Sequence, residues 1–150
     1  MSLDVTVDGA DEIAPGLALI KGGGGKLLRE KIVASASKRF VIIADESKQV
    51  EKLGRFPLPV EVIPMAAPLV SDSLQKLGFT PSIRVNQDGT RYITDEGNLI
   101  LDCHGLLMEN PEEIVAKIDS IVGVVEHGLF LKMADLALIA GQHGVIERSS

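Results

Sequence analysis

Three carboxylates, Asp8, Asp11 and Glu12, stand within five residues of one another near the start of the sequence. If their side chains pack together they repel, so the pKa of one should rise unless a cation compensates. Such a group could exchange protons with a substrate or bind a divalent metal ion. The metal hypothesis is the weaker one, because no histidine or second carboxylate cluster completes a coordination shell. In isolation the segment is also compatible with an ordinary acidic turn.

A run of four glycines, Gly22–Gly25, lies between Lys21 and Lys26. Consecutive glycines cost folding entropy, so a plain loop rarely needs them. They allow backbone N–H groups to approach an anion at the positive end of a following helix. The familiar nucleotide motifs do not fit, because Ile20 and Leu27 occupy positions where those motifs need glycine, serine or threonine. A flexible hinge remains the alternative interpretation.

Two further charged residues are candidates for the site only because of where they lie in the sequence. Glu30 follows the glycines by about one helical turn, and Lys48 follows the apolar run 40–44. Each taken alone is typical of a solvent-facing side chain. Cys103 has no identifiable base nearby in the sequence. The three histidines, His104, His127 and His143, show no ligand spacing. His104 is interpreted as a turn residue after a strand, and the other two as structural or exposed.

The hydrophobic pattern predicts the elements that position these residues. We expect a strand over 4–8, a short apolar strand over 17–20, a helix over 26–38 with Leu28, Ile32 and Ala36 on one face, and a strand over 40–44. Charged residues follow each of the three apolar runs directly. Strand–helix–strand alternation favours a βαβ unit in a parallel sheet. In such sheets the carboxyl ends of the strands line the ligand crevice.

The pattern of predicted elements changes near residue 57, where prolines become frequent. There we expect strands over 59–63, 82–86, 90–94, 98–103 and 123–127, and helices over 66–77 and 111–121. Apart from one extra strand, this is the split βαβ order of a ferredoxin-like unit. A final strand over 134–140 is expected to return to the first sheet. A strand that starts at residue 4 lacks an upstream neighbour, so we also expect the chain to be part of a longer protein.

Composition excludes several functional classes. The chain has 15 basic and 21 acidic residues, a net charge of −6, which disfavours non-specific binding to nucleic acid or anionic membranes. Aromatic residues make up 3% and tryptophan is absent, so a base-stacking platform is not expected. The single Cys103 excludes an intramolecular disulfide and fits a reducing compartment, which predicts a cytoplasmic location.

Together these motifs resemble the type A ribose-5-phosphate isomerase family. The resemblance runs from Asp4 to about Gly144. Its segments are Asp8–Ile13, Lys21–Gly24, Leu28–Lys31, Ala44–Lys48, Phe56–Pro64, Asn98–Gly105 and Gly128–Phe130.

The resemblance implies an aldose–ketose isomerase of the pentose phosphate pathway that interconverts D-ribose 5-phosphate and D-ribulose 5-phosphate through an enediolate, with no metal or cofactor. Glu30 takes the position of the family's proton acceptor, with Asp8, Asp11 and Lys21 as further catalytic residues. Lys21 can stabilise charge on the sugar oxygens and an aspartate can handle ring opening. The implied substrate contacts are Asp8, Gly9, Ala10, Asp11, Lys21, Gly22, Gly23, Gly24 and Lys48.

The resemblance also implies a fold, and the sequence departs from the family pattern in one respect. The expected fold class is α/β: a partial Rossmann-like parallel-sheet domain, residues 1–56 plus 129–150, with an inserted α+β ferredoxin-like lid domain, residues 57–128. The family carries an upstream phosphate-binding loop that has no counterpart in these 150 residues. We therefore expect this chain to be inactive, or nearly so, by itself. An exposed sheet edge predicts a homodimer or higher homo-oligomer. The resemblance implies the same, because members of the family are usually homo-oligomers.

Two other functional classes stay open at this point. A non-catalytic sugar-phosphate sensor could use the same scaffold. A plain interaction domain could be built on the ferredoxin-like half. Glu30 favours the enzyme, because a sensor would not require a base.

Overall fold

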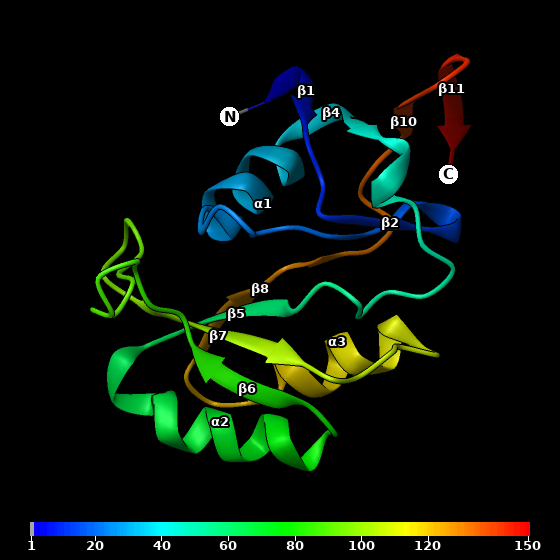
Figure 1. Cartoon of the computed structure of the whole chain (residues 1–150). Helices are drawn as coiled ribbons and strands as arrows, with labels where there is room; N and C mark the ends of the chain where they lie inside the picture. The colour runs from blue at the N-terminus through cyan, green and yellow to red at the C-terminus, as the bar shows by residue number, and fades with distance from the viewer. Residues whose placement is uncertain (1) are drawn as a thin grey trace.

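The computed structural model describes residues 2–150. Its first sheet has the strand order β1-β4-β10-β11 (Figure 1). The bounds are β1 Leu3–Asp8, β4 Ser37–Asp45, β10 Leu136–Gly141 and β11 Gly144–Ser149. The pairs β1–β4 and β4–β10 are parallel, which confirms the predicted parallel sheet and the return of the last predicted strand. The hairpin strand β11 was not predicted; it pairs antiparallel to β10.

Helix α1, Leu27–Ser35, packs beside this sheet and joins β3 to β4 (Figure 1). The predicted helix over 26–38 is too long, because β4 begins at Ser37. The predicted buried face is also wrong, since the Ile32 side chain is 51% exposed whereas Leu27 and Ala34 are buried. The face that contains Leu27 and Ala34 also contains positions 30 and 31, at helical spacing.

A small second sheet lies between the two larger ones, in the order β2-β3-β9. Its strands are β2 Glu12–Ala14, β3 Ala18–Ile20 and β9 Leu129–Phe130, and β2 was not predicted. Between β2 and β3 a short 3-10 turn, η1 (Pro15–Leu17), places Gly16 at a φ of 76°. The antiparallel pairing of β3 with β9 brings residues around 130 beside the end of β3. This pairing matters because Lys21 follows β3 directly.

The third sheet has the order β6-β7-β5-β8 and is antiparallel throughout. Its strands are β5 Leu58–Val62, β6 Thr80–Ile83, β7 Leu99–His104 and β8 Val124–His127, with helices α2 Ala67–Lys76 and α3 Pro111–Asp119. Both helices lie on the side of this sheet away from α1 (Figure 1). The β-α-β-β-α-β order is that of a ferredoxin-like unit. The extra strand predicted over 90–94 is absent from the described residues, where only an isolated bridge joins Val85 to Arg91.

Side chains from all three sheets form two hydrophobic clusters. One lies mainly within the third sheet and its helices and includes Val60, Val70 and Leu101. The other joins the parallel sheet to the small second sheet, with Ala34 as its member from α1, and includes Phe40 and Phe130. Every strand pair joins strands within 1–56 plus 129–150 or within 57–128. The division into two domains at these boundaries stays a prediction. Within residues 2–150, no helix has the length and apolar character that a membrane crossing requires.

Candidate active site

Lys21 is the centre of the candidate site. Strand β3 ends at Ile20, and the Lys21 backbone N–H donates to the Gly128 carbonyl at 2.9 Å. Its side chain is only 2% exposed. The Nζ donates a short hydrogen bond to the Gly9 carbonyl, and lies 3.1 Å from Asp8 Oδ2 and 3.3 Å from Glu30 Oε2. Three oxygens therefore compensate the buried ammonium, as burial of a charge requires.

Asp8 and Glu30 reach this lysine from different elements, β1 and α1. Burial favours the neutral form of Asp8, but attraction and a hydrogen bond from Lys21, with the Gly9 N–H, hold the pKa of Asp8 below its ordinary 3.8. At Glu30 the balance is reversed. Burial raises the pKa of Glu30 above its ordinary 4.5; Lys21 opposes this rise and Asp8 adds to it. The pKa values of the two carboxyl groups are thus shifted in opposite directions, that of Asp8 downward and that of Glu30 upward.

Asp11 faces the glycine loop instead of Lys21. The Gly23 N–H donates to Asp11 Oδ2 at 2.8 Å, and a Cβ on Gly23 would lie 2.7 Å from Asp11 Oδ1. Within the loop the Gly25 N–H donates to the Gly22 carbonyl at 2.9 Å. Gly22 and Gly25 have φ values of 101° and 81°, which favour glycine. The loop therefore needs glycine for its shape as well as for close approach.

Lys48 lies in the 3-10 turn η2, Glu46–Lys48, just beyond β4. It lines a cavity of about 360 Å³ that Asp11 also lines. The structure thus brings Lys48 to the same edge of the molecule as Asp11, as the ends of parallel strands require.

Glu12 differs from the other two carboxylates of its segment. It is buried, at 3% exposure, and accepts hydrogen bonds from the backbone N–H groups of Gly54 and Phe56 at 2.9 and 3.0 Å. It holds the connection toward β5 and takes no part in the Lys21 cluster.

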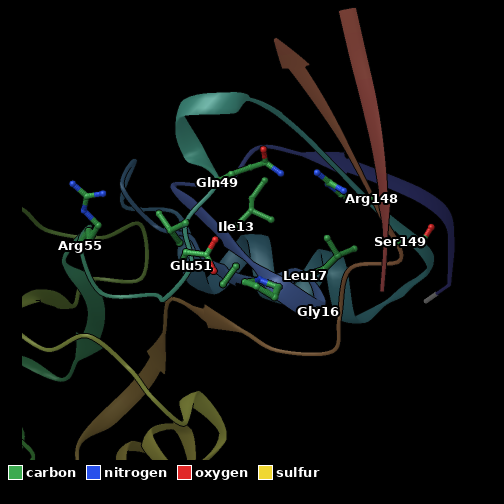
Figure 2. A pocket seen from close by; sticks show the side chains of 11 residues that line it. Ile13, Gly16, Leu17, Gln49, Glu51, Arg55, Arg148 and Ser149 are labelled. Carbon is green, nitrogen blue, oxygen red and sulfur yellow. The ribbon is translucent and has the colours of Figure 1, made fainter.

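A larger cavity, of about 560 Å³, lies outside the Lys21 cluster (Figure 2). Its wall includes Ile13, Leu17, Gln49, Glu51, Arg55 and Arg148. The side chains of Gln49 and Arg148 turn toward its middle in Figure 2. None of the residues predicted to bind substrate lines it.

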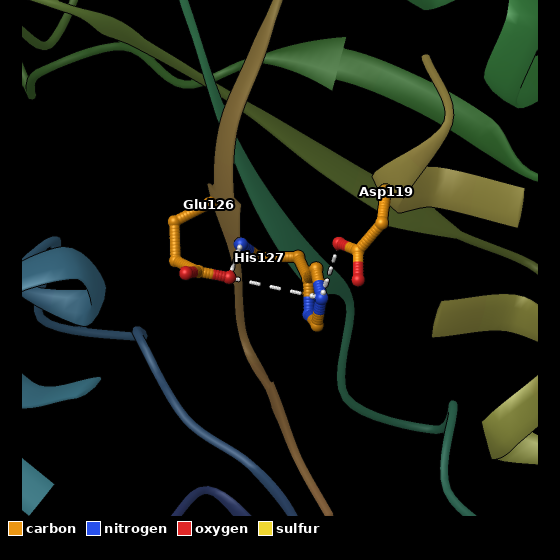
Figure 3. A group of neighbouring side chains, drawn as sticks. All are labelled: Asp119, Glu126 and His127. Carbon is orange, nitrogen blue, oxygen red and sulfur yellow. Dashed lines mark hydrogen bonds and ion pairs between the residues drawn. The ribbon is translucent and has the colours of Figure 1, made fainter. Parts of the chain in front are cut away.

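One cluster has the composition of a metal site. The ligand atoms of Asp119, Glu126 and His127 lie within 4.8 Å of one another (Figure 3). However, His127 Nδ1 accepts the Leu129 N–H at 3.1 Å and Nε2 lies 3.1 Å from Asp119 Oδ1, so both ring nitrogens have partners. The ammonium of Lys31 lies 2.8 Å from Glu126 Oε1. The cluster is therefore compensated by a cation of the chain itself and does not suit a metal.

Burial lowers the pKa of His127, and the positive charge of Lys31 lowers it further, against the opposing effect of Glu126 and Asp119. The neutral imidazole is thus the favoured form. This agrees with the expectation that His127 and His143 are structural or exposed, since His127 is buried and His143 is exposed. His104, expected in a turn, is the exposed last residue of β7.

Two residues near the site were missed from the sequence. Phe130 lies with its ring centroid 5.6 Å from Lys21 Nζ and 4.8 Å from Lys31 Nζ. Arg84 donates to the carbonyls of Gly22 and Gly23, at 3.1 Å each. These residues lie far along the chain from Lys21; Phe130 belongs to the resembling segment Gly128–Phe130 but was given no place in the site, and Arg84 lies outside the resembling segments. Only the tertiary structure brings them to Lys21 and to the glycine loop.

Fold and site together define an α/β protein whose polar site lies at the carboxyl edge of a parallel sheet and carries a buried lysine between two carboxylates, one with a lowered and one with a raised pKa. Comparison with known proteins gives the family. The chain belongs to the ribose 5-phosphate isomerase A (phosphoriboisomerase A) family, whose model matches residues 1–144.

Curated relatives carry the same name. Ribose-5-phosphate isomerase A of Roseiflexus castenholzii is 56% identical over 147 residues, which cover 97% of this chain and 63% of that protein. The protein of the same name from Bordetella pertussis is 54% identical over 145 residues, covering 96% and 62%. The chain therefore spans about 63% of the length of such relatives.

Solved structures agree with the fold. The ribose 5-phosphate isomerase A of Neisseria gonorrhoeae has a TM-score of 0.92 at 46% identity, covering 99% of this chain and 65% of that one. The Methanocaldococcus jannaschii structure has a TM-score of 0.94 at 41% identity, covering 100% and 67%. A D-ribose-5-phosphate isomerase in complex with phospho-erythronic acid has a TM-score of 0.95 at 34% identity, covering 99% and 66%. The predicted family and α/β fold class are thereby confirmed.

Proposed function

We propose that this chain carries the acid–base centre of an isomerase that interconverts D-ribose 5-phosphate and D-ribulose 5-phosphate. The observation that carries the proposal is the buried Lys21 ammonium between Asp8 and Glu30. A sugar-phosphate sensor would not need a carboxylate whose pKa is raised beside such a cation, so the geometry favours the enzyme. The names of the relatives give the same sugar phosphate, ribose 5-phosphate, and the same class of reaction, an isomerisation.

The proposed reaction moves one proton between neighbouring carbons. Glu30 removes the proton on C2 of the open-chain aldose, the electron pair of that C–H bond forms the C1–C2 double bond, and the π pair of the C1 carbonyl moves onto O1 to give the enediolate. A proton passes from O2 to O1, the O2 electron pair forms the C2 carbonyl, and the C1–C2 π pair takes the proton back from Glu30 at C1. Atoms and electrons balance within the substrate, so no external oxidant or reductant enters. The raised pKa of Glu30 makes it a better proton acceptor than an ordinary carboxylate.

Lys21 and the glycine loop supply the complementary charge. Negative charge develops on the substrate oxygens in the enediolate, and a buried ammonium stabilises it more strongly than a solvated one would. Gly22–Gly24, together with Gly9 and Ala10, allow the backbone to approach the sugar. Asp8 and Asp11 are the proposed acids and bases for ring opening and for the hydroxyl protons. Lys48 is proposed to contact the anionic substrate at the rim.

The direct test is isotopic. In deuterium oxide, turnover through an enediolate leaves solvent deuterium on C1 of the ketose, in a fraction set by exchange at Glu30. Transfer of the C2 hydrogen as a hydride would leave no solvent label. Mass spectrometry of the ribulose 5-phosphate formed therefore separates the two routes.

We propose further that the chain alone is a poor catalyst, because it spans only about 63% of the length of its named relatives. Binding contacts remote from the reacting carbons contribute to transition-state stabilisation. Turnover close to that of the Roseiflexus castenholzii protein, measured side by side, would contradict this part. Deuterium incorporation at a low rate would support both parts together.

Self-association is the last part of the proposal. β1 is an edge strand of the parallel sheet, and the side chains of Val5, Val7 and Ile43 are each at least half exposed. An open edge with apolar side chains favours pairing with a second copy. Sedimentation analysis of the chain is expected to give a homodimer or larger species, and a monomer at all concentrations would contradict the proposal.

A further inference from the structure

Arg84 follows β6 and reaches the outer side of the glycine loop, although 60 residues separate it from Gly24 in sequence. Asp102 on β7 holds its guanidinium through two hydrogen bonds, Nε to Oδ2 at 2.9 Å and Nη2 to Oδ1 at 2.6 Å. Both side chains are largely buried, at 15% and 16% exposure. A bidentate pair of this kind fixes the orientation of the guanidinium plane. Its remaining nitrogen, Nη1, is thereby directed at the loop.

Nη1 donates to two successive carbonyls, those of Gly22 and Gly23, each at 3.1 Å. In a planar trans peptide the C=O and the next N–H point in opposite directions. Holding the Gly22 carbonyl on Arg84 therefore turns the Gly23 N–H to the other side, where it donates to Asp11 Oδ2 at 2.8 Å. Holding the Gly23 carbonyl turns the Gly24 N–H to that same side. Two successive N–H groups on one side form a concave donor surface for anionic oxygen.

Tyr92 also lies against the glycine loop, beside Arg84. The Arg84 guanidinium carbon lies 5.8 Å from the centre of the Tyr92 ring. A Cβ on Gly25 would lie 2.2 Å from the Tyr92 hydroxyl oxygen, so the loop and Tyr92 are in close contact. Arg84, Asp102 and Tyr92 all belong to the segment 57–128, whereas Asp11 and the loop do not. The contact therefore links the two parts of the chain at the candidate site.

We infer that Arg84 is a positioning residue, which sets the peptide orientation of the glycine loop and, through the Gly22–Gly23 peptide, the position of Asp11. The inference rests on the proposed function for its catalytic consequence, but not for its structural one. Four glycines have a wide choice of backbone conformations, so without an outer anchor their N–H groups would not share one direction. Arg84 selects that direction from the side of the loop opposite to Asp11.

The structural consequence is tested by NMR on the chain itself. An amide proton that is bonded to a carboxylate has a distinctive chemical shift, and Asp11→Ala defines the shift of the Gly23 amide without that bond. In Arg84→Met we expect the Gly23 amide to move at least about half of the way to the Asp11→Ala value, because the glycine backbone is then free to rotate. Arg84→Lys should give an intermediate shift, since an ammonium reaches the carbonyls but cannot keep the bidentate pair with Asp102.

Matched variants separate positioning from general damage. Arg91→Met changes an exposed arginine of the same segment and should leave the Gly23 amide at the wild-type position. Asp102→Asn retains Arg84 but weakens its anchor, so the Gly23 amide should shift in the same direction as in Arg84→Met. If Arg84→Met does not fold, Arg84→Lys and Asp102→Asn report on the same amide. A Gly23 amide that stays at the wild-type position in the folded Arg84 variants would overturn the inference.

The catalytic consequence is measured separately. Arg84→Met is expected to lower kcat for D-ribose 5-phosphate by about 10- to 100-fold, the scale of a small misplacement at an active site, with a smaller change in KM. Partial recovery of kcat is expected in Arg84→Lys. Unchanged kcat together with a shifted Gly23 amide would overturn the catalytic consequence alone. If the wild-type chain shows no turnover and no deuterium incorporation, the proposed function fails, whereas the amide shifts still decide whether Arg84 positions the loop.

Discussion

Glu30 and Lys31 are consecutive residues of α1, yet their side chains enter two separate buried networks. Glu30 Oε2 lies 3.3 Å from Lys21 Nζ, whereas Lys31 Nζ lies 2.8 Å from Glu126 Oε1. Both positions share the inner face of the helix with buried Leu27 and Ala34. The helix therefore presents charged groups where an amphipathic helix normally presents apolar ones. Lys31 pairs with a residue of β8, whereas Glu30 belongs to the Lys21 cluster, which we propose as the acid–base centre.

Glu30→Gln should abolish isomerisation while leaving substrate binding in place. The amide keeps the shape of the side chain but cannot accept a proton, and loss of a general base costs about 100- to 10,000-fold in rate. Initial rates of ketose formation and chemical-shift changes on adding D-ribose 5-phosphate measure the two effects. Glu112→Gln, on the exposed side of α3, is the matched control and should behave as wild type. Equal rates in the two variants would remove Glu30 from the mechanism.

Lys21→Met should raise the pKa of Glu30 further. In the wild type, burial already raises that pKa and the Lys21 charge opposes the rise. Without the cation the carboxylate is less favourable, so Glu30 keeps its proton to a higher pH. The pKa of Asp8 should rise as well, because Lys21 holds it down. Carboxyl 13C shifts recorded across the acid range measure both changes.

Lys26→Met is the control for this titration. Lys26 lies at the other end of the glycine loop, is half exposed and pairs with Asp95 at 2.7 Å. Its removal should leave the Glu30 titration at the wild-type pH. A Glu30 pKa that falls or stays constant in Lys21→Met would show that the Lys21 charge does not reach Glu30 as the geometry indicates.

The elements of this fold were predictable wherever local pattern and tertiary packing agree. The apolar run 40–44 became the centre of β4, and Asn110 caps α3 by accepting the Glu113 N–H, as its sequence indicates. At α1 the two signals disagree. The apolar spacing of Leu28 and Ile32 favoured one face, but the structure buries the face of Glu30 and Lys31 because their charges are paired. The hydrophobic pattern depends only on the apolar residues, so it cannot indicate that a charged side chain will be buried in an ion pair.

The site was predictable only as far as its residues are close in sequence. Lys21, Asp8 and Glu30 lie within local motifs, and the structure brings them together. Arg84 and Phe130 reach the same region through strand pairings across the chain, which no spacing in one sequence reveals. The separation of Glu12 from Asp11 was likewise not predictable, because the partners of Glu12 are backbone N–H groups more than 40 residues away, at Gly54 and Phe56.

Lys31→Met should destabilise the protein, because it leaves Glu126 without its cation in a largely buried position. Lys31 is 14% exposed and Glu126 25% exposed. Removal of one partner of a buried pair costs on the order of 3 kcal/mol in the free energy of unfolding. Urea denaturation monitored by circular dichroism measures this loss. Lys117→Met removes an exposed i,i+4 pair with Glu113 and should cost only about 0.5 kcal/mol or less. Comparable losses in both variants would contradict the role assigned to Lys31.

Gly23→Ala and Gly24→Ala should differ although the residues are neighbours. A Cβ at Gly23 would lie 2.7 Å from Asp11 Oδ1, whereas a Cβ at Gly24 meets no atom within 4 Å. Gly23→Ala should therefore displace Asp11 and lose a hydrogen bond to a charged group, about 1.5–3 kcal/mol of stability. Gly24→Ala should be neutral or gain up to about 1 kcal/mol, because alanine restricts the unfolded chain. Thermal unfolding compares them directly, and similar losses would contradict the loop geometry.

His127 should make the stability of the protein depend on pH near neutrality. Burial and Lys31 lower the pKa of His127 below its ordinary 6.5, so the unfolded chain takes up a proton at a higher pH than the folded protein does. The free energy of unfolding should then fall as the pH drops below about 6.5, by at most about 1.4 kcal/mol per pH unit for one group. The lowered pKa values of Asp8 and Glu126 act at more acid pH, since their ordinary values are 3.8 and 4.5.

His127→Gln isolates this effect, because glutamine does not titrate. Urea denaturation at several values between about pH 7.5 and pH 5.5 should show the decline in the wild type and a flatter profile in the variant. His104→Gln replaces an exposed histidine and should keep the wild-type slope. A decline that persists unchanged in His127→Gln would mean that another group takes up the proton. In that case His127 would take up its proton in the folded protein as readily as in the unfolded chain, although the Lys31 charge disfavours the protonated form.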